Sequence, residues 1–123
     1  MTIEENPNMY KLEVQDLHKR YGSHEVIKGV SMAAKAGDVI SIIGSSGSGK
    51  STTLSMLAGF ETPSSGEILV DGQSLVNVPP HKRDIGMVFQ RYSLFPHLNV
   101  RDNIGFPLAI RKLGASETSK RVD

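Results

Sequence analysis

One short stretch of the chain combines glycines with a lysine and hydroxyl groups at a spacing that could bind phosphate. Its residues fit the pattern G-x-x-x-x-G-K-[ST] and are Gly44, Ser45, Ser46, Gly47, Ser48, Gly49, Lys50 and Ser51. Glycine adopts backbone angles that are closed to other residues, so successive N–H groups can point at phosphate oxygens. Lys50 would bring a cation to the β- and γ-phosphates, and the Ser51 hydroxyl would bind Mg²⁺. The spacing therefore predicts a site for a nucleoside triphosphate with Mg²⁺.

The segments on either side of this loop have the patterns of a strand and a helix. Residues 39–43 are a β-branched apolar run, which is typical of a buried parallel strand. After the loop, Leu54, Leu57 and Ala58 recur at helical spacing, and Gly59 is expected to end the helix. A strand entering the loop and a helix leaving it favour the phosphate interpretation. The alternative is a glycine-rich surface turn; kinases, GTPases and motor ATPases would all share a phosphate loop.

The rest of the chain alternates between extended and helical patterns, which predicts an α/β chain. The expected elements are an edge strand with Leu12, Val14 and Leu17, a strand over 26–34, a strand over 67–70 with a hairpin turn at Asp71 and Gly72, an exposed basic loop over 79–84, a buried strand over 85–89, a helix capped by Asn99 and a helix from Ser116. The periodicity gives the type of each element but not its neighbours in space.

Composition limits the classes of function. The chain has 123 residues, which suits one small domain or part of a larger one. Its 14 basic and 13 acidic residues give a formal net charge of +1, which argues against nucleic acid or an anionic membrane surface as the main partner. Cysteine is absent, which excludes disulfides and fits a reducing compartment. Residues 1–9 form a polar leader unlike a secretory signal, and no apolar run is long enough for direct membrane insertion.

Four segments in sequence order resemble the ATP-binding subunits of bacterial ABC importers. They are Leu-His-Lys-Arg-Tyr-Gly at 17–22, the phosphate loop continued through Thr52, Gly-Glu-Ile-Leu-Val-Asp-Gly at 66–72 and Ile-Gly-Met-Val-Phe-Gln at 85–90. The resemblance covers residues 10–123. It implies a P-loop NTPase core of the ABC ATPase type with an N-terminal antiparallel β portion, present here in incomplete form. It also implies that the nucleotide is ATP.

The resemblance assigns roles to two further residues. Tyr21 would stack on adenine, for which an aromatic ring is suitable because base stacking is worth about 1–3 kcal/mol. Gln90 would reach Mg²⁺ and the attacking water, so Ser51 and Gln90 are the expected metal contacts. The alternatives are a surface tyrosine in a turn and an ordinary polar residue at a strand end. Thr52 would extend the set of nucleotide-binding residues from the phosphate loop.

The resemblance also implies partners and a location. The intact subunit would pair head-to-tail with a second copy and dock on membrane-spanning permease subunits at the cytoplasmic face of the inner membrane. Residues 93–97 would face the permease, and Leu94 and Phe95 suit a docking surface. The competing interpretation is that both side chains fill the core of their own domain. His97 is not expected to bind metal because no second His or Cys lies at ligand spacing.

Several family motifs do not occur in the 123 residues. These are the Walker B acidic strand end with its catalytic glutamate, the Ser-Gly-Gly signature and the switch histidine. We therefore expect residues 10–123 to be the N-terminal half of the nucleotide-binding domain, which binds ATP with little hydrolysis. The alternatives are a non-hydrolytic binding module and a different phosphotransferase such as a small kinase. Residues 12–52 resemble subunits for polar amino acid uptake and residues 79–112 those for polyamine or sugar uptake, so the solute stays open.

Overall fold

The computed structural model describes residues 10–123, so the predicted polar leader over 1–9 lies outside the described residues. The chain divides into two compact units, the first ending at Met87 and the second running from Val88 to Asp123. Each unit is described by itself.

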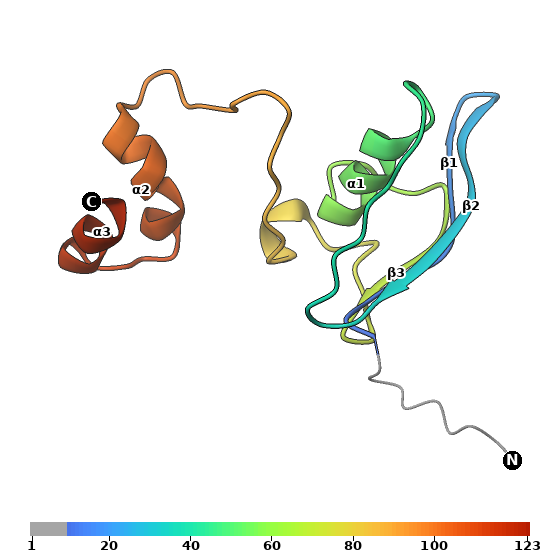
Figure 1. The fold of residues 1–123 in the computed structure, drawn as a ribbon, viewed down its shortest axis with the longest axis horizontal. Coiled ribbons are helices and arrows are strands. Elements are labelled where there is room, and N and C mark those ends of the chain that lie inside the picture. The colour runs from blue at the N-terminus through green and yellow to red at the C-terminus, as the bar shows by residue number, and fades with distance from the viewer. Residues whose placement is uncertain (1–9) are drawn as a thin grey trace, which may run out of the picture. The chain divides into compact units, whose positions relative to one another are not determined.

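The first unit contains a four-stranded antiparallel sheet (Figure 1). Its strands are β1 (Leu12–Tyr21), β2 (His24–Ala34), β3 (Ser65–Val70) and β4 (Gln73–Ser74), in the spatial order β2-β1-β3-β4. β1 therefore pairs on both sides, and the prediction of an edge strand there is wrong. The alternating pattern showed that one face of this strand is buried, but strand edges are satisfied by backbone groups that leave no mark in the side-chain pattern.

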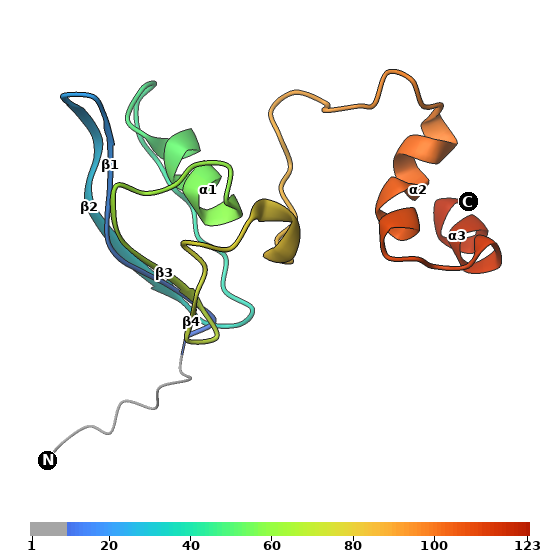
Figure 2. The same ribbon diagram turned by 180° about the vertical axis from the view of Figure 1, so that it is seen from behind.

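One helix covers a face of this sheet, as Figures 1 and 2 show. It is α1 (Lys50–Ala58), and it ends where Gly59 adopts a left-handed conformation, as predicted. Met56 is fully buried against side chains of three strands, and the core cluster consists of Val14, Leu17, Ile27, Met56 and Ile68. Leu54 is exposed, so the predicted apolar face of the helix is displaced toward Met56.

Two predicted strands do not form. Residues 39–43 and 85–89 have no regular secondary structure, and Val39, Ile43 and Val88 are each more than 90% exposed. The predictions of buried strands are therefore wrong for this chain. A parallel strand is held by hydrogen bonds to neighbours on both sides and by layers covering both faces. Residues 10–123 supply neither for these two runs.

The predicted basic loop over 79–84 is partly wrong. Pro80–Lys82 form a short 3₁₀ helix, and Arg83 is only 6% exposed. Its Nη1 donates to the carbonyl oxygens of Met56 at 2.8 Å and Leu57 at 3.0 Å. These carbonyls lie at the C-terminal end of α1, where the last helical C=O groups lack partners and the helix dipole is negative. The arginine therefore caps the helix instead of facing solvent.

The second unit contains two helices. α2 (Val100–Ile110) is capped by Asn99, whose side chain accepts from the Asp102 N–H at 2.8 Å, as predicted. α3 (Ala115–Val122) begins one residue before the predicted start. Arg101 joins the two helices by an ion pair of 2.6 Å to Asp123. Among the helices in the described part of the chain, none is both long and apolar enough to cross a membrane.

Candidate nucleotide site

The phosphate loop is a tight turn that leads directly into α1. The Ser48 N–H donates to the Ser45 carbonyl at 3.2 Å, and Gly47 and Gly49 have φ angles of 78° and 96°. A Cβ at Gly49 would overlap the Ile27 side chain of β2. Glycine is thus required at position 49 both by the backbone conformation and by the approach of the loop to the sheet.

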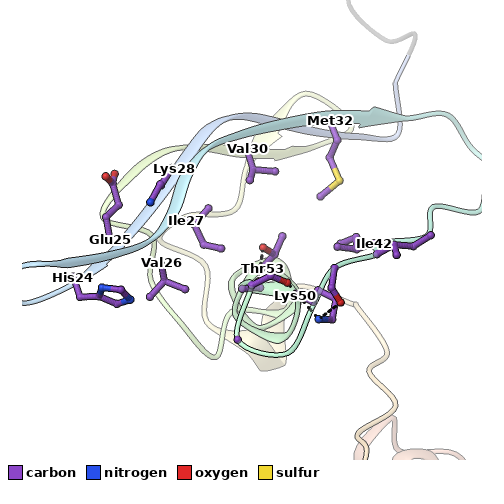
Figure 3. A pocket seen from close by; sticks show the side chains of 15 residues that line it. His24, Glu25, Val26, Ile27, Lys28, Val30, Met32, Ile42, Lys50 and Thr53 are labelled. Carbon is purple, nitrogen blue, oxygen red and sulfur yellow. Dashed lines mark hydrogen bonds between the residues drawn. The ribbon is translucent and has the colours of Figure 1, made fainter.

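Lys50 is held inside the loop by the loop's own backbone. Its Nζ donates to the Gly44 carbonyl oxygen at 2.7 Å and to Ser48 Oγ at 3.3 Å (Figure 3). It also donates to the Ser45 carbonyl oxygen at 2.6 Å. These acceptors fix the ammonium without neutralising its charge, because none of them is a carboxylate. The positive charge therefore remains, but all three N–H donors are in use, so phosphate oxygens would replace loop acceptors when an anion binds.

The start of α1 adds further donors. The first N–H groups of a helix have no partner within the helix, and the helix dipole places partial positive charge there. No acidic residue occupies the first turn of α1. Ser45, Ser46 and Ser51 are exposed, and Thr52 is half-buried. Thr53 is buried and its Oγ1 donates to the Gly49 carbonyl at 2.9 Å, which fixes the helix start.

Magnesium would have to be held largely by the nucleotide. Across residues 10–123 there is no cluster of three His, Cys, Asp or Glu side chains that could form a metal site. The exposed Ser51 hydroxyl at the helix start fits one Mg²⁺ position, since this ion binds phosphate oxygens while retaining several waters. The residues present thus fit an Mg²⁺–phosphate pair and not a free metal ion.

A cavity of about 580 Å³ lies between the loop and one face of β2 (Figure 3). Val26, Ile27, Val30 and Met32 of β2 line its apolar wall, and Lys50 lines its polar end. This volume is within the usual range of about 300–1,000 Å³ for small-molecule sites. The cavity therefore combines an apolar surface with charged side chains, of which Lys50 is the one on the phosphate loop.

Tyr21 ends β1 in the same unit as the loop. Its ring is 47% exposed, and the Nζ of Lys19 lies 4.9 Å from the ring centroid. Tyr21 does not itself line the cavity, but it pairs across the β1–β2 hairpin with His24, which does. The structure thus brings the predicted adenine residue to the same hairpin that forms one wall of the cavity.

Gln90 and residues 93–97 belong to the second unit, and the predicted role of Gln90 stays a prediction. Gln90 is exposed and lies in irregular chain. Leu94 is 67% exposed, as a docking residue would be. Phe95 is 38% exposed, and its ring lies 4.3 Å from that of Phe106 in α2. The docking role of residues 93–97 stays a prediction.

The structure also reveals a charged cluster that the sequence patterns did not indicate. His18 lies between two carboxylates, with Nδ1 at 2.8 Å from Glu25 and Nε2 at 3.1 Å from Asp16. Hydrogen bonds to Glu25 and then Asp16 raise the pKa of His18, and the His18 hydrogen bond lowers the pKa of Glu25. Asp16 and His18 are two residues apart on β1, so their side chains lie on the same side of the strand. Glu25 belongs to β2 and comes next to His18 only because the two strands form a hairpin.

Comparisons with known proteins agree with this geometry. The chain is similar to an ATP-binding cassette solved as a dimer in a post-hydrolysis state with ADP and Pi, with a TM-score of 0.78 and 28% identity over 90% of this chain and 53% of that one. Fold and phosphate loop thus define part of an ATP-binding cassette. The family described as ABC transporter matches residues 27–123, and the chain belongs to this family. The predicted family and fold class are confirmed.

The chain is also similar to two curated ATP-binding proteins of transport systems. The chain is 45% identical to the spermidine/putrescine import ATP-binding protein PotA of Nitrosomonas eutropha, over 94% of this chain and 32% of that protein. It is 50% identical to the arginine/ornithine transport ATP-binding protein AotP of Pseudomonas aeruginosa, over 89% of this chain and 48% of that protein. The chain therefore spans about a third to a half of the length of these relatives.

Proposed function

We propose that this chain binds ATP with Mg²⁺ as part of an ABC transporter ATPase subunit that powers solute import. The observation that carries the proposal is the Lys50 ammonium, which two loop carbonyls hold at the start of α1. The unpaired N–H groups of the helix and the fixed cation together suit a triphosphate. The membership in the ABC transporter family supports the same ligand.

Each predicted site residue has a place in this proposal. The loop residues 44–49, apart from Ser48 whose N–H bonds to Ser45, would present their N–H groups to the phosphates, and Lys50 would bind the β- and γ-phosphate oxygens. The Ser51 hydroxyl would hold Mg²⁺, whose charge would be the chemistry it supplies during phosphoryl transfer. Tyr21 would stack on the adenine, for which its half-exposed ring is accessible. Gln90 would approach the Mg²⁺ and orient water.

Hydrolysis by the chain itself is expected to be inefficient. Among the described residues that line the cavity, Glu25 is the one carboxylate, and it pairs with His18. A carboxylate engaged in this way is unsuited to orient a water at the γ-phosphate. We therefore propose ATP binding without efficient turnover for residues 10–123, and ATP hydrolysis coupled to transport for the intact subunit of the family.

The proposed partners follow from the relatives. Both curated relatives carry transport functions in their names, and the solved cassette is a dimer. We propose permease subunits and a second ATP-binding subunit as partners, at the cytoplasmic face of the inner membrane. The named solutes are polyamines in one relative and basic amino acids in the other. A nitrogen-rich cationic solute is therefore the shared chemistry.

The Lys50→Ala variant tests the site. Because hydrogen bonds to charged groups are worth about 1.5–3 kcal/mol, we expect MgATP affinity to fall at least tenfold. Isothermal titration calorimetry of the 123-residue chain measures this. Lys11→Ala is the matched control, since Lys11 is an exposed lysine that pairs with Asp71 at 2.5 Å. An unchanged affinity in Lys50→Ala, with Lys11→Ala also unchanged, would sink the assignment of the phosphate loop.

A further inference from the structure

Lys19 is a shielded lysine close to the proposed adenine residue. Its side chain is only 13% exposed, and it lies two positions before Tyr21 on β1. Residues two apart on a strand project to the same side of the sheet. The Nζ of Lys19 lies 4.9 Å from the centroid of the Tyr21 ring, within the range of a cation–π contact. The ring and the cation therefore form one unit on this side of the hairpin.

The same ammonium is anchored on its other side. It forms an ion pair of 2.9 Å with Glu61 and donates to the Thr62 carbonyl at 2.7 Å. Both acceptors follow the C-terminal end of α1, the helix that begins at the phosphate loop. Lys19 thus connects the strand that carries Tyr21 with the segment that follows this helix.

Glu61 links the ammonium over the Tyr21 ring to the segment after α1. The hydrogen bond from Lys19 lowers the pKa of Glu61, so this carboxylate stays charged beside the ammonium. Lys19 is therefore held by Glu61 while it lies over the Tyr21 ring. A ring that is already held in place loses little further freedom when a ligand stacks on it.

Backbone contacts support the arrangement around Lys19. The Ser64 N–H donates to the His18 carbonyl at 2.8 Å, and the Arg20 N–H donates to Ser64 Oγ at 2.9 Å. These bonds fix the segment after Glu61 along β1 on both sides of Lys19. The position of the ammonium is thus set by the fold and not by the lysine rotamer alone.

An aromatic ring has two faces, and Lys19 lies over one of them. We propose that Lys19 is a positioning residue for nucleotide binding: it occupies one face of Tyr21 and, with Glu61, fixes the ring so that the purine base stacks on the opposite face. The proposal rests on the proposed function, because it requires Tyr21 to contact the base. Lys19 itself contacts neither the base nor the phosphates in this arrangement.

The test compares a ligand with a base and a ligand without one. Calorimetry measures the Kd of MgATP and of magnesium tripolyphosphate for the wild-type chain, Lys19→Met and the control Lys11→Met. The loss expected for MgATP in Lys19→Met is about two- to twelvefold, because a ring that Lys19 no longer holds must be ordered when the base binds. Tripolyphosphate affinity is expected to stay within about twofold, because Lys50 and the loop are intact. Lys11→Met is expected to change neither.

Two further variants separate positioning from stability. In the Tyr21→Ala background, Lys19→Met is expected to cause no additional loss of MgATP affinity, since the lysine acts through the ring. Lys19→Arg is expected to restore affinity, because a guanidinium also stacks on an aromatic face and pairs with a carboxylate. Glu61→Gln, a milder change that keeps the size of the side chain, is expected to weaken MgATP and not tripolyphosphate.

The outcomes distinguish the two proposals. A wild-type chain that binds neither ligand would overturn the proposed function and this inference together. If the wild type binds both ligands and Lys19→Met weakens them equally, the lysine is merely structural and only this inference fails. An unchanged MgATP affinity in both Lys19→Met and Glu61→Gln overturns the inference as well. A loss in Lys19→Met that persists undiminished in the Tyr21→Ala background does the same.

Discussion

β2 and residues 39–43 both contain Val and Ile side chains suited to a strand, yet only β2 forms one. β2 pairs with β1 from Ala34 opposite Leu12 to His24 opposite Tyr21, and its Ile27 is 3% exposed. Residues 39–43 are at least as apolar, but they pair with nothing in residues 10–123, and Ile43 is 92% exposed. Apolar composition thus gives a segment the capacity to be a strand, whereas a partner edge decides whether it becomes one.

Amide hydrogen exchange directly measures the difference in backbone pairing between β2 and residues 39–43. It is the measurement in which we expect the largest effect. The β1 and β2 amides that bond across the hairpin open only with the sheet, so we expect them to exchange at least about a hundredfold more slowly than unstructured peptide. Amides of residues 40–43 are expected to exchange at close to the unstructured rate. Mass spectrometry of peptides from the two segments is the measurement. Equal protection in both would mean that residues 39–43 are paired in solution.

Truncation of one isoleucine in each region sharpens the comparison. Ile68 is fully buried in the core beneath α1, so Ile68→Ala is expected to lower the free energy of unfolding by about 2–5 kcal/mol. Ile43→Ala removes the same atoms from a side chain that is 92% exposed and is expected to change it by less than about 0.5 kcal/mol. Urea unfolding followed by circular dichroism measures both. A large loss in Ile43→Ala would show that this side chain is packed.

The smallest effect we expect is a pH dependence of the free energy of unfolding, which comes from His18 in the paired sheet. The pKa of His18 is raised above its ordinary 6.5 by hydrogen bonds to Glu25 and Asp16. Its contribution to stability is therefore fully present below pH 6.5 and is lost as the pH rises through the raised pKa. The lowered pKa of Glu25 adds a separate loss only under acid conditions.

Urea unfolding of the wild type and of His18→Gln across this pH range tests the histidine. We expect the wild type to lose stability relative to His18→Gln as the pH rises above 6.5, since glutamine does not titrate there. The protection of residues 40–43 relative to unstructured peptide at each pH serves as the internal control, because these residues lie in the unpaired region. Parallel pH profiles for the two proteins would contradict the role of His18.

The sequence was sufficient where an element is decided within a few residues. The left-handed Gly49 and Gly59, the Asn99 cap and the hairpin at Asp71 and Gly72 are local, and the structure confirms the turns and helix ends they predict. Their signals are short-range because each depends on the backbone angles or hydrogen bonds of one turn. The predicted start of α3 at Ser116 is one residue too late, because the helix begins at Ala115 after Gly114 and not after a polar capping side chain.

The errors concern distant partners. The interior position of β1 depends on β3, which begins more than forty residues later, and the burial of Arg83 depends on carbonyls near Met56. Neither the pairing of β1 with β3 nor the burial of Arg83 produces a periodic pattern of side chains. The backbone groups at strand edges and helix ends form hydrogen bonds with whichever group the fold brings to them. Residues 85–89 were expected to be buried for the same reason that 39–43 were: the side chains are apolar, and the missing neighbour is invisible in the pattern.

The sequence by itself determined the phosphate loop, since G-x-x-x-x-G-K-[ST] sets which backbone angles and which cation are available at one turn. It also determined the family, through ordered motifs that the match over residues 27–123 confirms. Only the tertiary structure decided that Lys19 joins Tyr21 to Glu61. The physical reason is that local angles are encoded residue by residue, whereas a contact between strand and loop exists only after the chain has folded.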